Sequence, residues 1–156
     1  MPKTTGLKFD RLSLTRVSRN LNKAIKKLKK GSKAGLIEAG LMIKAKASPI
    51  TPLKFSNLRN SAYVTWAGAS ITPTTFAGKD AAELATQHSQ VISGVLMGQS
   101  GNKEPWVAIG YTASYAIYVH EMNKNYTIGS WKFLAVTIQE NKKNILKLIA
   151  KRAKIK

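Results

Sequence analysis

The sequence predicts an α+β domain, in which a long N-terminal helix and a C-terminal helix pack on one antiparallel sheet of three to four strands. Three observations support this fold class: helical spacing of apolar residues at both ends, two-residue alternation in the middle, and 44% hydrophobic residues, enough for a core. A length of 156 residues suits a single domain covering residues 1–156.

The first element expected is a basic helix at residues 14–47, preceded by an N-terminal arm at 1–13. Its apolar residues recur at intervals of three and four, at Leu14, Val17, Leu21, Ile25 and Leu28. Because glycine weakens a helix interior, Gly31 predicts either a kink near this position or two helices in series. The helix should end by Ser48, since prolines at 49 and 52 disfavour helical geometry in the residues before them.

The middle of the chain, residues 48–123, is expected to form the sheet. Ser61–Trp66 alternates in period two, and Gln90–Met97 and Pro105–Tyr111 are two further strand candidates. Tyr115–Val119 fits either a strand or a short helix. Residues 67–89 are rich in Ala, Gly, Ser and Thr, which predicts a flexible loop.

The last element expected is a basic C-terminal helix at residues 131–154. Its predicted apolar stripe consists of Trp131, Leu134, Ile138, Ile145, Leu148 and Ile149.

The formal charge of +19 is confined to the two ends of the chain. Residues 1–46 carry 13 Lys/Arg and 2 acids, residues 124–156 carry 9 Lys/Arg and one acid, and the middle is neutral. Such a charge favours nucleic acid, an acidic surface or an acidic protein as partner. The chain has no cysteine, which excludes disulfide scaffolds and thiolate metal sites, and it has no apolar run long enough to cross a membrane.

Lysines on the two helices are the residues expected to face DNA or an acidic partner. They are Lys23, Lys26, Lys27, Lys29, Lys30, Lys142, Lys143, Lys147 and Lys151. A solvated helix surface is the ordinary explanation of such faces, but the acids that would balance them are missing. Lys outnumbers Arg by 21 to 5, which favours diffuse attraction to phosphate over bidentate reading of bases.

The sequence offers little for catalysis, and we expect no enzyme activity, no metal and no cofactor. His120–Glu121 lacks the second histidine of a HExxH zinc site, and a neighbouring pair of this kind is more often a surface or interface pair. Asp80 and Glu83 leave a small hydrolase or nuclease as a distant alternative.

Three short motifs resemble those of bacteriophage neck and tail-completion proteins of long-tailed phages. The first is a T-P-x-x-T-G-x-L-R-x-S stretch, the second a Y-A-x-x-V-E/H segment, and the third a (K/P)-F-L start of the last helix. The positions that match them are Thr51, Pro52, Leu58, Arg59 and Ser61, then Tyr115, Ala116, Val119 and His120 or Glu121, then Phe133 and Leu134.

The resemblance implies a structural virion protein of the neck or tail terminus, assembled in the bacterial cytoplasm. Such subunits form homo-oligomeric rings, with a hexamer as the expected order, that join the head connector to the tail tube or end tail growth. Connector, stopper and tail tube proteins would be partners, with phage DNA in the channel and no membrane. The alternative is a sequence-nonspecific DNA-binding protein that uses the lysine-rich helices.

Six residues are candidates for subunit contacts: Arg59, Asn57, Tyr115, Tyr118, His120 and Glu121. Arg59 can form bidentate bonds to a carboxylate across an interface, but pinning its own loop to a strand or helix is an equal alternative. Tyr115, Tyr118 and His120 fit either packing of helix on sheet or an interface.

Overall fold

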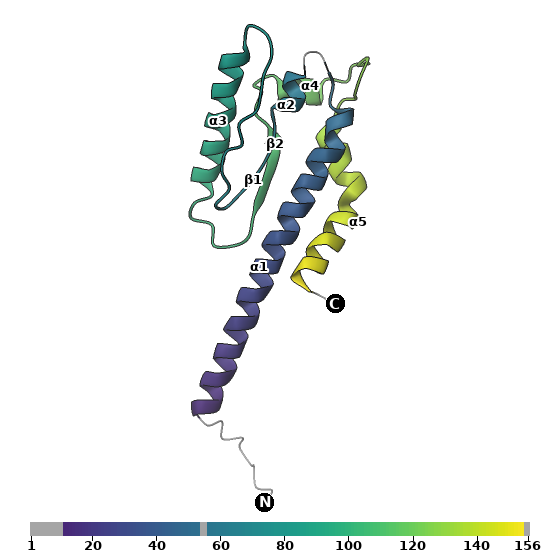
Figure 1. Ribbon diagram of the computed structural model, residues 1–156. Coiled ribbons are helices and arrows are strands. Elements are labelled where there is room, and N and C mark those ends of the chain that lie inside the picture. Colours follow the sequence, from purple (N-terminus) through teal and green to yellow (C-terminus); the bar gives the residue numbers. More distant parts are fainter. Residues whose placement is uncertain (1–10, 54–55, 155–156) are drawn as a thin grey trace, which may run out of the picture.

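The computed structural model describes residues 11–53 and 56–154. Its elements in chain order are α1 (Arg11–Ile50), α2 (Asn57–Asn60), β1 (Ala62–Trp66), α3 (Ala81–Gly98), β2 (Val107–Tyr111), α4 (Ala116–Glu121) and α5 (Phe133–Ala153). Figure 1 shows α3 on one side of a small sheet, α1 on the other, and α5 beside α1. The mixed helix-and-sheet class with long terminal helices is confirmed.

The sheet has two antiparallel strands among the described residues, so the expectation of three to four strands is not confirmed. β1 pairs with β2, with Ala62 opposite Tyr111 and Trp66 opposite Val107. The third candidate, Gln90–Met97, lies inside helix α3, and Tyr115–Val119 belongs to the short helix α4. The β-branched residues of 90–97 favour a strand locally, but apolar spacing of four across Leu84, His88 and Ile92 buries one helical face.

Only the first part of the expected loop at 67–89 is irregular, because α3 begins at Ala81. Side chains of α2 hold this segment in place. The Asn57 amide donates to the Ala77 carbonyl and accepts from the Ala77 N–H, both at 2.8 Å, and Asn60 donates to the Thr75 carbonyl at 2.7 Å. The path of residues 67–80 is therefore fixed by bonds to α2.

Helix α1 runs without interruption through its glycines. A Cβ on Gly31 would lie 2.4 Å from the Arg152 carbonyl oxygen, and one on Gly35 would lie 2.6 Å from the Ile149 Cα. These two glycines let the backbones of α1 and α5 approach closely, as small residues do at tight helix crossings. The expected kink near residue 31 is absent from the described helix because helix packing requires glycine at this position.

α1 also passes Pro49 and ends at Ile50, beyond the expected end at Ser48. Proline removes one helical hydrogen bond, and the carbonyls of a final turn need other donors. Arg59 supplies two: its Nη2 donates to the Pro49 carbonyl at 2.9 Å and its Nε to the Thr51 carbonyl at 3.0 Å. The Ser130 N–H donates to the Ile50 carbonyl at 2.9 Å, which completes the end of α1.

The core lies where α2, α3, α4 and the start of α5 meet. Its buried members are Leu58, Phe76, Leu84, Ala113, Ala116 and Phe133. Phe133 has no exposed surface and receives ring contacts from Tyr111 and His120, with centroids 5.0 and 4.9 Å away.

The inward face of α5 differs from the predicted stripe. Phe133, Thr137 and Asn141 are buried, whereas Trp131 and Ile138 remain 37% and 39% exposed. Thr137 and Asn141 donate to carbonyls one turn earlier, which satisfies their polar groups inside the helix pair. Small polar residues thus take positions that hydrophobicity alone would give to larger apolar neighbours.

Candidate assembly surface

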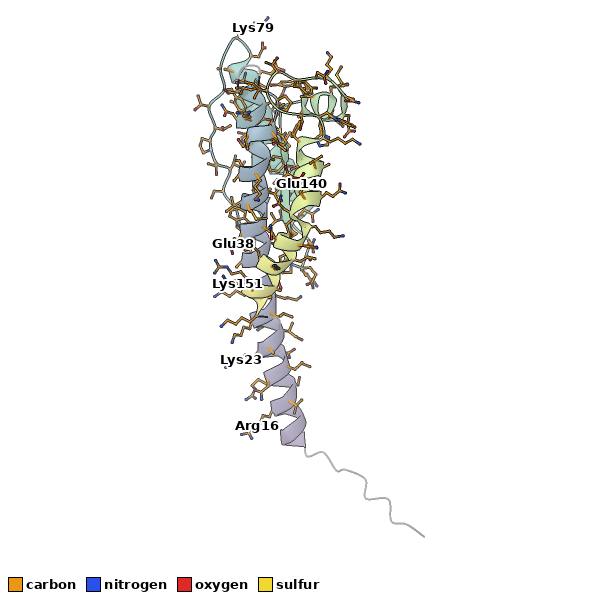
Figure 2. All side chains as sticks on the ribbon, turned by 90° about the vertical axis from the view of Figure 1, so that its right-hand side faces the viewer. Arg16, Lys23, Glu38, Lys79, Glu140 and Lys151 are labelled. Atoms are coloured by element: carbon orange, nitrogen blue, oxygen red, sulfur yellow. The ribbon has the colours of Figure 1, made fainter. Side chains whose placement is uncertain are left out.

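The first half of α1 stands clear of every other described element. Residues 15–30, called the stalk from here on, continue the helix below the point where α5 stops (Figure 1). Figure 2 shows its side chains spreading outwards around Arg16 and Lys23. The stalk is the surface on which any function of this chain depends most, because so much of it is uncovered.

The apolar face of the stalk has no cover within the described chain. Val17, Leu21, Ile25 and Leu28 are 62%, 59%, 43% and 44% exposed. Their spacing places them along one side of the helix, as the sequence predicts. A continuous apolar stripe of this kind marks an interaction surface more often than a solvated one.

The remaining faces of the stalk are basic. Residues 15–30 contain seven Lys/Arg and no acid, and Lys29 is paired with Glu104 at 2.6 Å. Several cations lie four residues apart, as Lys23 and Lys27 do, which disfavours the isolated helix through repulsion. The first turn of α1 also lacks an acidic residue to complement the helix dipole. A partner that covers the stripe or neutralises the charge would therefore stabilise the stalk.

The cations expected on α5 are all exposed. They are Lys142, Lys143, Lys147 and Lys151. Next to them, Arg152 Nε donates to Glu38 Oε2 of α1 at 2.6 Å, and this bond lowers the pKa of Glu38. This ion pair lies at the surface, so its contribution is small beside the glycine contact next to it.

Of the six residues proposed for subunit contacts, Asn57 and Arg59 have internal partners. Asn57 is buried and bonded to Ala77, and Arg59 closes the end of α1. For Arg59 the structure thus favours the alternative of pinning its own chain. Since Arg59 and Asn57 are polar residues just before a strand, only the positions of α1 and residue 77 could have revealed these roles.

The remaining four candidates lie on α4 and the residues next to it. His120 packs edge-on against Phe133 and contacts Glu121, with its Nδ1 2.7 Å from Glu121 Oε1. Tyr115 and Tyr118 are 38% and 69% exposed, and Ile117 beside them is 67% exposed. His120 therefore serves packing of α4 on α5, while Tyr118 and Ile117 form an uncovered apolar surface.

A buried polar chain, which sequence reasoning did not predict, links α3 to the sheet. His88 Nδ1 lies 2.9 Å from the Thr112 hydroxyl, which donates to the Ser61 carbonyl at 3.3 Å. Because the Thr112 proton is used in this way, His88 donates from Nδ1. Burial lowers the pKa of His88, and nearby Lys44 lowers it further.

Neither a metal centre nor a membrane segment is found in the described part of the chain. No group of three or more His, Cys, Asp or Glu residues gathers there to hold a metal ion. None of the helices at 11–50 or 56–154 is long and apolar enough to span a bilayer.

Comparison of the chain with known protein families, with characterised proteins and with solved structures finds no match. The resemblance to phage neck proteins therefore depends on the three sequence motifs.

Proposed function

We propose that this chain is a structural virion protein of a bacteriophage neck or tail terminus, a ring-forming subunit that joins the head connector to the tail tube or ends tail growth. The three motifs that suggest this function lie at junctions of the fold. The first joins α1 to β1 through α2, the second forms α4, and the third opens α5. Motif residues therefore coincide with the contacts that hold the helices together.

The observation that carries the proposal is the uncovered stripe of the stalk. Burying a large aliphatic side chain contributes about 1.5–3 kcal/mol, so four half-exposed ones leave roughly 4 kcal/mol unrealised in the isolated chain. A subunit of an assembly recovers this energy when a neighbouring protein covers the helix. No reactive cluster is needed for that role, because a ring requires complementary surfaces.

The second candidate function is sequence-nonspecific DNA binding, favoured by the seven cations of the stalk. Lysines on a helix attract phosphates and release counterions without reading sequence. A phosphate backbone, however, leaves an aliphatic stripe in water. The stripe is the reason to place assembly first, with DNA passing close to the basic faces.

Electron microscopy and mass measurement of the purified chain test the proposal together. We expect closed rings from the wild type, and mainly monomers from a Leu21→Ser/Ile25→Ser variant with an unchanged unfolding midpoint. Leu146→Ser on α5 is the matched control, because Leu146 is similarly exposed, at 58%, but lies off the stalk. A persistent wild-type monomer that binds duplex DNA with a steep salt dependence would favour the second candidate.

A charge variant tests the basic faces in the virus itself. Lys26→Glu, Lys27→Glu and Lys30→Glu together should impair assembly or DNA passage while the purified protein keeps its fold. Normal numbers of infectious particles would remove this role from the stalk lysines.

A further inference from the structure

We infer that a cavity beside α4 receives the stalk of a second copy of this chain, so that subunits associate head to tail. The inference builds on the proposed ring-forming function and adds the identity of the two surfaces in contact.

The cavity has a volume of about 620 Å³ and lies between α2, the start of α3, α4 and the segment 125–128. Its apolar walls include Leu53, Leu84 and Ile128, and Tyr115 stands at its side. Ile117 and Tyr118 extend the apolar surface along α4 outside it. A site of this size and polarity suits the apolar face of a helix rather than a flat surface.

The charged and amide groups of the cavity call for a hydrogen-bond donor. Asp80 and Glu83 contribute carboxylates, and Glu83 Oε1 accepts from Gln87 Nε2 at 3.0 Å. Gln87 Oε1 is itself buried and has no hydrogen-bond partner. The described lining residues include no Lys, Arg or His, although the protein has a charge of +19. A guanidinium or ammonium group entering the cavity would satisfy both the carboxylates and the free amide oxygen.

The stalk presents this combination of groups. Arg19 and Lys23 flank Leu21, so one helical turn offers cations and an aliphatic side chain together. The charges are complementary, since residues 15–30 carry only positive charge and the cavity only negative charge among its described residues. Pairing of two stalks with each other would instead place seven cations against seven, which disfavours a symmetric contact through this helix.

The position of the two surfaces makes the contact intermolecular. The cavity lies at the end of the molecule that carries α2 and α4, and the stalk extends from the opposite end (Figure 1). In Figure 2, Lys79, which precedes Asp80, marks one end and Arg16 the other. Two different surfaces that join copies head to tail form a ring when the rotation between subunits closes, as the proposed function requires.

Reciprocal charge reversal tests the pairing. Asp80→Lys/Glu83→Lys and Arg19→Glu/Lys23→Glu should each weaken self-association about tenfold or more, because like charges then face each other. An equimolar mixture should restore it, since both pairings in the mixture are again complementary. Circular dichroism and unfolding curves verify that each variant folds. Folded variants that associate like the wild type, or a mixture that fails to recover, would overturn the inference.

Cysteine cross-linking gives a second measurement, which does not depend on those variants. The chain has no cysteine, so Leu21→Cys/Ile128→Cys introduces the only thiols. Under mild oxidation we expect a ladder of linked oligomers. The control, Leu21→Cys/Met97→Cys, should give none, because Met97 is 75% exposed at the end of α3 away from the cavity.

The outcomes separate this inference from the proposed function. Rings without the 21–128 ladder would contradict the head-to-tail contact and leave a ring-forming protein. A ladder with open filaments would support the contact and contradict the ring. A wild type that stays monomeric at millimolar concentration and gives no ladder would overturn the inference, whereas assembly on phage tail tubes would still support the neck role.

Discussion

The two halves of α1 share one helix and one apolar spacing but have opposite environments. From Gly31 to Ile50 the helix packs on α5 and on the sheet, and Ala39, Ile43 and Ala47 are buried. In the stalk, larger residues such as Leu21 and Ile25 stay exposed. Small residues in the covered half let other backbones approach, whereas large residues in the stalk provide surface for a partner.

This difference shows that residue size carries information that apolar spacing does not. Within the covered half, a Cβ on Gly40 would lie 2.9 Å from the side chains of Val64 and Val107, so the sheet approaches α1 as closely as α5 does. A helix whose apolar positions change from large to small along its length is one that changes partners. The four predictions below test the two halves separately.

The largest effect is expected from filling the close contact between α1 and α5. Gly35→Leu should lower the free energy of unfolding by about 3 kcal/mol, because the new side chain would overlap the backbone of α5. Gly94→Ala is the control: Gly94 lies within α3 with open space around it, so this change should stabilise by about 0.5–1 kcal/mol. Urea unfolding measures both. Equal effects at the two positions would show that the glycine contact does not hold the helices.

The next largest effect concerns the end of the covered half. Arg59→Ala should cost about 2 kcal/mol, since two carbonyls at the end of α1 lose a charged donor. Arg59→Lys keeps the charge but cannot make both bonds, so it should fall between. Thermal unfolding of the three proteins gives the order. An Arg59→Ala protein as stable as the wild type would return Arg59 to the candidates for subunit contacts.

Acid should loosen the covered half through His88. Its pKa is lowered on folding from an ordinary value of 6.5, so the unfolded chain binds more protons, and stability is lost as the pH falls below 6.5. His88→Asn should reduce this dependence. Amide exchange of residues 36–47, corrected for its intrinsic pH dependence, should accelerate between pH 7 and pH 5 in the wild type. A His88→Asn protein with the same pH dependence would place the sensitivity elsewhere.

The smallest effect is expected in the stalk. Salt screens like charges four residues apart, each such pair costing about 0.2–0.5 kcal/mol, so helicity of residues 15–30 should rise with ionic strength. Carbon chemical shifts at low and high salt measure it, with residues 36–47 as an internal reference. The same change in both halves would mean that repulsion in the stalk is not its cause.

Sequence reasoning correctly identified the terminal helices and both strands, because their periodicities extend over enough residues to be distinctive. It was wrong for Gln90–Met97, where β-branched residues outweighed a helical spacing that includes a buried histidine. The exposure of the stalk stripe could not be predicted, since apolar residues at helical spacing look alike whether or not another element covers them. The roles of Gly31 and Arg59 were hidden for a related reason: each depends on backbone atoms that are distant in the sequence, in α5 and at the end of α1.

The place where α5 stops determines how much of α1 is available to a partner. α5 ends because Lys154 adopts the left-handed conformation, with φ of 58°, after its last turn meets Gly31. Each further turn of α5 would extend it by about 5.4 Å and cover one more turn of α1, beginning with Leu28. Variation at the C-terminus of this protein could therefore adjust the reach of its N-terminal helix without changing a residue of that helix.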